Sequence, residues 1–329
     1  MWCAVTLYFA FQFILRLFPG ILREDIMQRF AIDTIAFGNL AGYYYLGYAG
    51  MQIPLGYLLD RFNIRFVVFI SIITASIGAL TFCYAKHWDF VLLGRFLIGT
   101  GSAVAFLSVA KVIKSFFPQK YHALMIAFSF TFGLTGAVIG GEPTKIIFDS
   151  FGYDTTLKLI ASIAVLIAFI VIFVNDKKIE KFEYNEEQNK ISFAETIKLI
   201  LSPTFLLIGL CGGLMVGSLE GFADVWGIAF LNHVYGYSEN ESIRAISVIY
   251  TGMCFGGPIL AFFAQKLKSN IMVIFFTGII TSVIFIVLFI SGNLDYAIIL
   301  AIMFLLGILC CYQVLVFTLT TEIFKKSSA

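Results

Sequence analysis

Long apolar stretches separated by short polar segments run through the whole sequence. An α-helix needs about 20 consecutive, mainly apolar residues to cross the hydrocarbon core of a bilayer. Because lipid offers no hydrogen bonds to backbone amides and carbonyls, each stretch is expected to be helical. The pattern therefore predicts an all-α polytopic membrane protein with about ten transmembrane helices. The predicted spans are 2–22, 36–59, 66–84, 90–113, 123–148, 157–174, 203–231, 243–263, 271–290 and 297–319.

Composition agrees with this class of protein and argues against several others. Hydrophobic residues make up 60% of the 329 residues and charged residues only 13%. A soluble domain carries about 25% charged residues. The net charge of +2 is too small to indicate a nucleic-acid partner. The six cysteines form no CxxC pair and the three histidines form no metal-binding pattern, so neither a cofactor nor an enzymatic site is expected.

The longest polar stretch, residues 176–190, reads DKKIEKFEYNEEQNK and follows the sixth span. Its charges nearly cancel, which is typical of a flexible tether between two bundles. The expected domains are a six-helix bundle at 1–175, a cytoplasmic linker at 176–196 and a four-helix bundle at 197–329.

Lysine and arginine are unevenly divided between the two sets of alternate loops. One set holds fourteen of the 22 basic residues, and the opposite set with its helix ends holds six. Short loops rich in Lys and Arg remain on the cytoplasmic side of a membrane. The N-terminus and the loop after the second span are therefore expected to be cytoplasmic.

A weak internal repeat relates the two halves of the sequence. It aligns Pro54 with Pro258 and Gly99 with Gly307, with matching hydropathy and basic helix ends. In this register the sequence stops at KKSSA, where an eleventh span is expected. The repeat therefore predicts a chain without the last two of twelve helices, and the alternative is a true ten-span protein.

The polar segment GYLLDRFNIR, residues 56–65, lies between the second and third spans. It resembles the signature G-x-x-x-D-R-x-G-R-[RK] of the major facilitator superfamily. Gly56, Asp60, Arg61 and Arg65 match this signature. Asn63 replaces its second glycine and is expected to adopt the left-handed backbone of that position. The alternative is a positively charged turn that only orients the protein.

Two further segments extend the resemblance over the whole chain. RFLIGTGSA, residues 95–103, resembles the R-x-x-x-G-x-G pattern of the fourth span, and GLTGAVIGGEP, residues 133–143, resembles the glycine and proline motif of the fifth. The resemblance implies two six-helix bundles, a central cavity and alternating access. It also implies a cytoplasmic gating latch, in which Asp60 lies near the start of an eleventh helix and the arginines pair with helix ends.

Charged residues inside spans are candidates for function because each costs at least ~2.5–3.5 kcal/mol at the bilayer centre. Arg16 and Arg95 lie in the first and fourth spans, which line the cavity in the resembled family, and a guanidinium can hold a carboxylate or phosphate with two hydrogen bonds. The alternatives are an Arg16 that reaches toward the outer surface, and an Arg95 with a structural or proton-coupling role.

Glu220 and Asp224 lie in the seventh span, which five glycines are expected to break or bend. Four residues apart on a helix, they would share one face and repel, which suits proton binding. They could instead bind a substrate amine, or lie outside the membrane. Tyr44 and Gln52 supply polar tips in the second span and are weaker candidates, since such tyrosines commonly serve packing.

The leading hypothesis is a secondary transporter, working by symport or antiport, for a small polar organic solute. Basic residues in one half and acidic residues in the other favour a zwitterion such as an amino acid or dipeptide, and in outline the chain resembles the dipeptide-exporting lysosomal branch of the superfamily. The alternatives are a transporter of organic anions or phosphate esters, and a non-transporting sensor or gene fragment. We expect a monomer in the bacterial inner membrane, with proton coupling as an open option.

Overall fold

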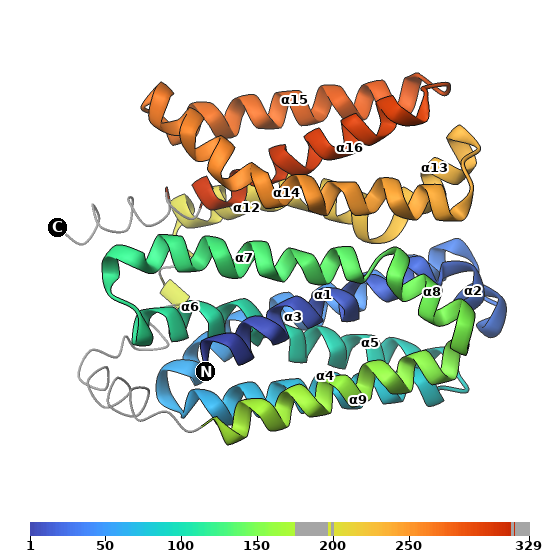
Figure 1. Cartoon of the computed structure of the whole chain (residues 1–329), viewed down its shortest axis with the longest axis horizontal. Helices are drawn as coiled ribbons and strands as arrows, with labels where there is room; N and C mark the ends of the chain where they lie inside the picture. Colours follow the sequence, from blue (N-terminus) through green and yellow to red (C-terminus); the bar gives the residue numbers. More distant parts are fainter. Residues whose placement is uncertain (175–196, 199–200, 317–318, 320–329) are drawn as a thin grey trace. The chain divides into compact units, whose positions relative to one another are not determined.

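Helices form all the regular structure in residues 1–174, 197–198, 201–316 and 319, which the computed structural model describes (Figure 1). The chain divides into two compact units, Met1–Lys190 and Ile191–Ala329. The predicted linker at 176–196 lies outside the described residues.

The described part of the first unit contains nine α-helices and a short 3-10 helix (Gln119–Tyr121). The α-helices are α1 (Trp2–Ile21), α2 (Arg23–Phe30), α3 (Thr34–Arg61), α4 (Ile64–Tyr84), α5 (Trp88–Ser102), α6 (Val104–Phe116), α7 (His122–Ile139), α8 (Glu142–Phe151) and α9 (Tyr153–Phe173). Helix α4 packs between α5 and α9, α3 packs on α5, and α1 packs on α7, so segments far apart in the sequence lie side by side (Figure 1).

The described part of the second unit contains α12 (Pro203–Gly221), a π-helical turn (Phe222–Trp226), α13 (Gly227–Tyr235), α14 (Glu239–Leu267), α15 (Asn270–Ile290) and α16 (Tyr296–Cys310). Helices α14 and α16 form its most extensive pair, and α15 packs on both. Helix α14 begins with a capping box in which Ser238 and Glu241 satisfy each other's backbone amides.

Nine helical stretches in the described residues are long and apolar enough to cross a membrane. The predicted second span corresponds to α3, which is 28 residues long but less apolar because tyrosines, glycines, Asn39 and Gln52 interrupt it. The all-α polytopic class is thereby confirmed. The predicted fifth span is interrupted between α7 and α8 at Gly141, which has φ −83° and ψ −122°. At Ala103, between α5 and α6, the backbone stays helical with φ −61° and ψ −25°, so the fourth span is continuous.

Close helix contacts through glycine recur in the two units with the same spacing. A Cβ atom at Gly47 would overlap the carbonyl of Phe96, and one at Gly99 would overlap the carbonyl of Tyr44. In the second unit, Gly252 meets the carbonyl of Phe304 and Gly307 meets that of Ile249 in the same way. On each of the four helices, the contacting glycine and the contacting carbonyl are three residues apart. The α3–α5 pair therefore corresponds to the α14–α16 pair.

The expectation of left-handed backbone at Asn63 is wrong. Asn63 has φ −57° and ψ 122°, and its side chain accepts a hydrogen bond from the backbone amide of Arg65 at 3.0 Å. An asparagine N-cap ends the turn by satisfying a free helix donor, so no positive φ is required. The residue that replaces the signature glycine therefore starts α4.

Candidate functional site

Arg95 repairs a gap in the hydrogen bonding of α1. Pro19 lies inside α1 and has no amide hydrogen, so the carbonyl four residues earlier, that of Leu15, loses its helical donor. Arg95 of α5 donates from Nη1 to the Leu15 carbonyl and from Nη2 to the Arg16 carbonyl, each at 2.6 Å. Only 4% of Arg95 is exposed. The guanidinium thus satisfies the carbonyl freed by the proline and ties α5 to α1.

Tyr44 of α3 completes this buried cluster. The Arg95 Cζ atom lies 4.4 Å from the centroid of the Tyr44 ring, and the Tyr44 hydroxyl donates to Gln12 Oε1 at 3.3 Å. Tyr44 and Gln12 are both buried. The structure therefore brings together two of the predicted residues, Arg95 and Tyr44, and adds Gln12, which the sequence pattern did not single out.

Arg16 is half-buried and lies against aromatic rings from two helices. Its Cζ atom lies 5.5 Å from the centroid of Tyr45 on α3 and 5.8 Å from that of Phe13 on α1. The aromatic rings stabilise the guanidinium through its flat face. A carboxylate binds the N–H groups at the edge of a guanidinium, so ring contacts and carboxylate binding use different parts of Arg16. Gln52 is half-buried on α3, about two turns after Tyr44.

Asp224 lies in the π-helical turn that interrupts the seventh span, so the predicted irregularity of this span is confirmed. Asp224 is 7% exposed, and its Oδ1 accepts a hydrogen bond of 2.6 Å from the hydroxyl of Tyr250 on α14. Tyr250 is itself buried. Single π turns are often found at functional sites. Glu220 is half-buried in the last turn of α12, just before the change of helical register.

The segment 56–65 contacts other helices of the first unit. Lys111 of α6 forms an ion pair with Asp60 at 3.1 Å and also donates to the backbone carbonyl of Leu59. The Lys111 side chain is 10% exposed and that of Asp60 is 67% exposed. Lys111 therefore caps the end of α3 as well as pairing with the acid. The resemblance had led us to expect the partner of Asp60 in an eleventh helix.

The two arginines of this segment have separate partners. Arg61 lies over the ring of Tyr57 with its Cζ atom 4.4 Å from the centroid. Arg65 donates from Nη1 to the backbone carbonyl of Val174 at 3.4 Å and from Nε to Asn63 Oδ1 at 3.3 Å. Arg65 thus links the start of α4 to the end of α9. A Cβ atom at Gly56 would meet no described atom within 4 Å outside the adjacent backbone of its own helix.

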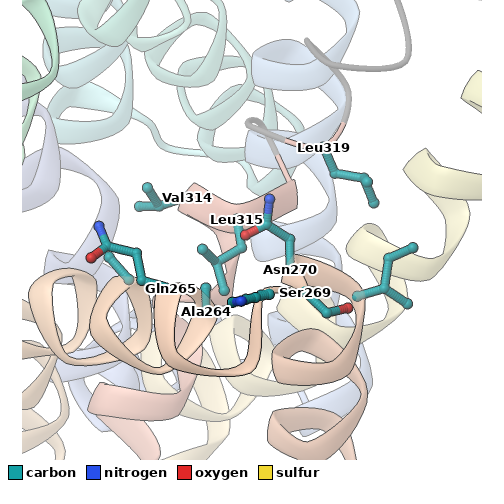
Figure 2. Close-up of a pocket in the computed structure, with 10 residues that line it drawn as sticks. Ala264, Gln265, Ser269, Asn270, Val314, Leu315 and Leu319 are labelled. Carbon is teal, nitrogen blue, oxygen red and sulfur yellow. The ribbon is translucent and has the colours of Figure 1, made fainter.

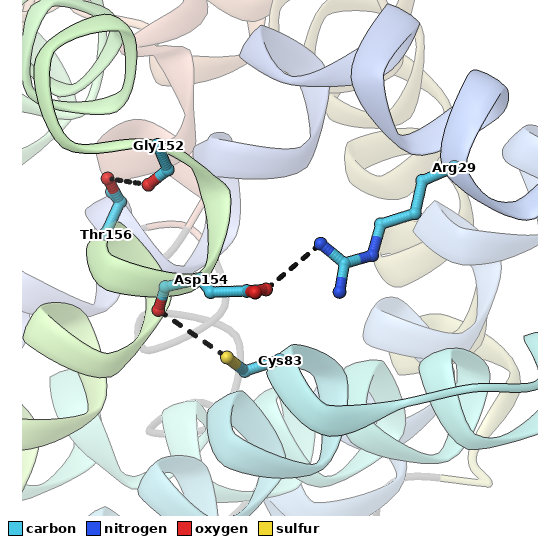
Figure 3. Close-up of polar contacts among 5 residues, drawn as sticks. All are labelled: Arg29, Cys83, Gly152, Asp154 and Thr156. Carbon is cyan, nitrogen blue, oxygen red and sulfur yellow. Dashed lines mark hydrogen bonds and ion pairs between the residues drawn. The ribbon is translucent and has the colours of Figure 1, made fainter.

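A second polar cluster closes the opposite end of the first unit (Figure 3). Arg29 of α2 forms an ion pair with Asp154 at the start of α9 at 3.0 Å, and lies over the ring of Tyr153 with its Cζ atom 4.3 Å from the centroid. The thiol of Cys83, at the end of α4, faces the carbonyl of Asp154 at 3.6 Å. These contacts hold α2 against the ends of α4 and α9.

Lys111, Gln12 and Tyr250 were missed as site residues by sequence reasoning. Lys111 lies near the end of the predicted fourth span, five residues before the end of α6, where a lysine is common for reasons of topology alone. Gln12 and Tyr250 are single polar residues in apolar runs, a signal that many packing residues share. Among the described residues, no group of three or more His, Cys, Asp or Glu side chains could hold a metal ion.

Comparison with known proteins places these features in a family. The chain is 25% identical over 270 residues to the uncharacterized transporter YybO of Bacillus subtilis, covering 74% of this chain and 61% of that protein. It is 26% identical over 275 residues to the lysosomal dipeptide transporter MFSD1 of Danio rerio, covering 77% of this chain and 59% of that protein. The chain thus spans about 60% of the length of these two relatives.

A solved structure shares the fold. The crystal structure of a bacterial homolog to the human lysosomal transporter Spinster, in an inward-facing and occupied conformation, superposes with a TM-score of 0.70 at 19% identity. It covers 94% of this chain and 72% of that one. The family model described as Major Facilitator Superfamily matches residues 1–329. The chain is a multi-pass integral membrane protein that belongs to the major facilitator superfamily.

Proposed function

We propose that this chain works as a secondary transporter that moves a small polar organic solute by alternating access. The match of the superfamily model along residues 1–329 is the observation that carries this proposal. Buried charge supports it, because Arg95 and Asp224 are almost fully enclosed within membrane-spanning helices. Charge at such depth is costly and is retained where it serves binding, coupling or structure. We place the protein in a bacterial inner membrane with a cytoplasmic N-terminus, as the loop charges favour.

We propose a zwitterion as the substrate, with a dipeptide or amino acid as the preferred class. Asp224 supplies a carboxylate for an ammonium group, and the Tyr250 hydroxyl orients that carboxylate through its 2.6 Å hydrogen bond. Arg16 supplies a cation for a carboxylate, held by the rings of Phe13 and Tyr45. The relative named as a dipeptide transporter is consistent with this class.

We assign Arg95 a positioning role, with Tyr44 as its neighbour. Both terminal nitrogens of Arg95 already donate to backbone carbonyls of α1. A substrate carboxylate would have to displace those bonds and leave the Leu15 carbonyl without a donor. Arg95 therefore acts on the substrate through α1, because it fixes the backbone that carries Arg16. Gln52 is proposed as a secondary polar contact on the half-buried part of α3.

Glu220 is the proposed proton-coupling group, because it is more exposed than Asp224 and lies just before the π-helical turn. For the gate, we propose that Gly56, Asp60, Arg61 and Arg65 act as a latch anchored within the first unit. Lys111 and the Val174 carbonyl supply that anchoring.

An organic anion or phosphate ester is the second candidate substrate class. The cation–π contacts that hold Arg16 favour it, because an arginine braced by two rings loses little entropy when its N–H edge binds an oxyanion. In this case Asp224 and Glu220 would both serve the proton.

Uptake into proteoliposomes separates the two classes. The purified chain is reconstituted and offered labelled dipeptides, amino acids, dicarboxylates and sugar phosphates, with and without a proton gradient. The zwitterion proposal expects uptake of a dipeptide or amino acid, at least tenfold weaker in Asp224→Asn and retained in the matched Asp295→Asn, an exposed acid of the same unit. Uptake of anions alone would transfer the proposal to the second class. Absence of uptake for every class would contradict transport itself.

A further inference from the structure

The second unit contains a pocket of about 580 Å³ where α14, α15 and the segment after α16 meet (Figure 2). One part of its lining is polar and comprises Gln265, Lys268, Ser269 and Asn270. The remainder is mainly aliphatic and comprises Ala261, Ala264, Ile271, Val314, Leu315 and Leu319. The pocket therefore offers one cationic group and several amide or hydroxyl groups beside an apolar wall.

The glycine contacts show which part of the first unit corresponds to this pocket. Leu59 comes twelve residues after Gly47, and Ala264 comes twelve residues after Gly252. In the partner helices, Lys111 comes twelve residues after Gly99, and Leu319 comes twelve residues after Gly307. By these glycine contacts, which shift the register by one residue from the Pro54–Pro258 alignment, Ala264, Gln265 and Leu319 are the counterparts of Leu59, Asp60 and Lys111. In the first unit this place is occupied by the Lys111 side chain, which caps α3 and pairs with Asp60.

The end of α14 is satisfied without a lysine from the neighbouring helix. Lys268 adopts left-handed backbone with φ 50°, and its amide donates to the Gln265 carbonyl at 3.3 Å. The amide of Ser269 donates to the Ala264 carbonyl at 3.2 Å. This C-terminal turn supplies the donors that Lys111 supplies in the first unit. The replacement of lysine by Leu319 therefore leaves α14 capped and leaves room beside it.

We propose that this pocket binds the phosphate-bearing headgroup of an anionic phospholipid from the cytoplasmic leaflet. Lys268 supplies the charge for the phosphate, and Gln265 and Asn270 supply side-chain amides beside it. The aliphatic residues Ile271, Leu315 and Leu319 give the first carbons of an acyl chain an apolar surface. The loop charges place this end of α14 on the cytoplasmic side, where anionic lipids gather. The site is independent of the transported substrate.

Native mass spectrometry of the full chain, released from nanodiscs, tests the proposal. Nanodiscs contain either phosphatidylglycerol or phosphatidylcholine, and a parallel titration adds inorganic phosphate. Lys268→Asn removes the charge with a residue that tolerates left-handed backbone, so the turn is preserved. Lys266→Gln is the matched control, because Lys266 does not line the pocket. Loss of Lys268, the lysine that lines the pocket, is expected to weaken binding of an anionic lipid about fivefold.

The expected result is retention of phosphatidylglycerol, about fivefold weaker in Lys268→Asn and close to wild type in Lys266→Gln. The double variant Gln265→Asp with Leu319→Lys, which restores the charge pair of the first unit, is expected to lose bound lipid as well. Equal retention of phosphatidylcholine, or equal loss in Lys268→Asn and Lys266→Gln, would overturn the proposal. Displacement of lipid by millimolar inorganic phosphate would instead identify a site for free phosphate.

Discussion

The bond between Arg95 and the Leu15 carbonyl predicts a specific coupling between two positions that do not touch through their side chains. Arg95→Met removes the donor, keeps an apolar side chain in place, and leaves the Leu15 carbonyl without a partner because Pro19 cannot donate. Pro19→Ala restores an amide hydrogen at the position that normally serves that carbonyl. The loss of Arg95 should therefore be less harmful when residue 19 is alanine.

The magnitude follows from the number of carbonyls involved. An unsatisfied buried carbonyl costs ~1–3 kcal/mol, and Arg95→Met leaves that of Leu15 without a donor, whereas the Arg16 carbonyl faces the amide of Gly20 one helical turn later. We expect Arg95→Met alone to lower the free energy of unfolding by ~1–3 kcal/mol. In the Pro19→Ala background one carbonyl regains a donor, so the loss should shrink by about 1–2 kcal/mol.

Equilibrium unfolding in mixed detergent micelles, followed by tryptophan fluorescence, measures the free energies of the double-mutant cycle. Pro258→Ala provides the control, because Pro258 lies in α14 of the other unit and should add to Arg95→Met without coupling. Additivity of Pro19→Ala and Arg95→Met within about 0.5 kcal/mol would refute the argument that Arg95 substitutes for the missing amide.

Three further predictions follow from contacts in the two units. Lys111→Met should lower the free energy of unfolding by ~1–3 kcal/mol, because it leaves the Leu59 carbonyl without a donor. Asp60→Asn should have little effect, because its ion pair with Lys111 is exposed on the Asp60 side. Equal losses of unfolding free energy in the two variants would contradict the capping role of Lys111. Gly307→Ala should push α16 away from α14 and reduce the yield of folded protein, because its Cβ would overlap the carbonyl of Ile249. Gly213→Ala is the control and should be neutral or slightly stabilising, since a Cβ at residue 213 meets open space. Equal yields of the two variants would show that close helix packing at Gly307 is not needed for folding. Tyr250→Phe should raise the KM for the transported solute about five- to tenfold with little change in protein yield, because the Asp224 carboxylate loses one hydrogen bond. An unchanged KM would show that Tyr250 does not contribute to the binding site.

Much of the fold could be predicted from the sequence because the bilayer imposes a simple rule. Every spanning segment must be apolar and helical, so ten spans could be counted, and helices correspond to all of them. The break in the fifth span was harder to predict. The Gly140–Gly141 pair allows the helix to break there, but a glycine pair does not by itself require a break.

The contacts of the candidate site were harder to predict because they depend on which helices meet. Arg95 and Tyr44 were selected for their chemistry, yet the role of Arg95 follows from its distance to Leu15, on another helix and 80 residues away. The ion pair of Asp60 with Lys111 likewise joins residues 51 apart in the chain. Asn63 failed as a predicted left-handed residue because the same side chain also serves as an N-cap, and the sequence motif does not distinguish these uses.

Counterflow in proteoliposomes tests the transport claim most directly. Vesicles loaded with an unlabelled dipeptide are diluted into trace labelled dipeptide, and the transient accumulation of label inside is recorded for the wild type, Asp224→Asn and Asp295→Asn. Alternating access predicts an overshoot of label that the wild type and Asp295→Asn share and that Asp224→Asn loses. If no loaded solute from the dipeptide, amino acid or organic anion classes produces an overshoot in the wild type, the proposed function is contradicted.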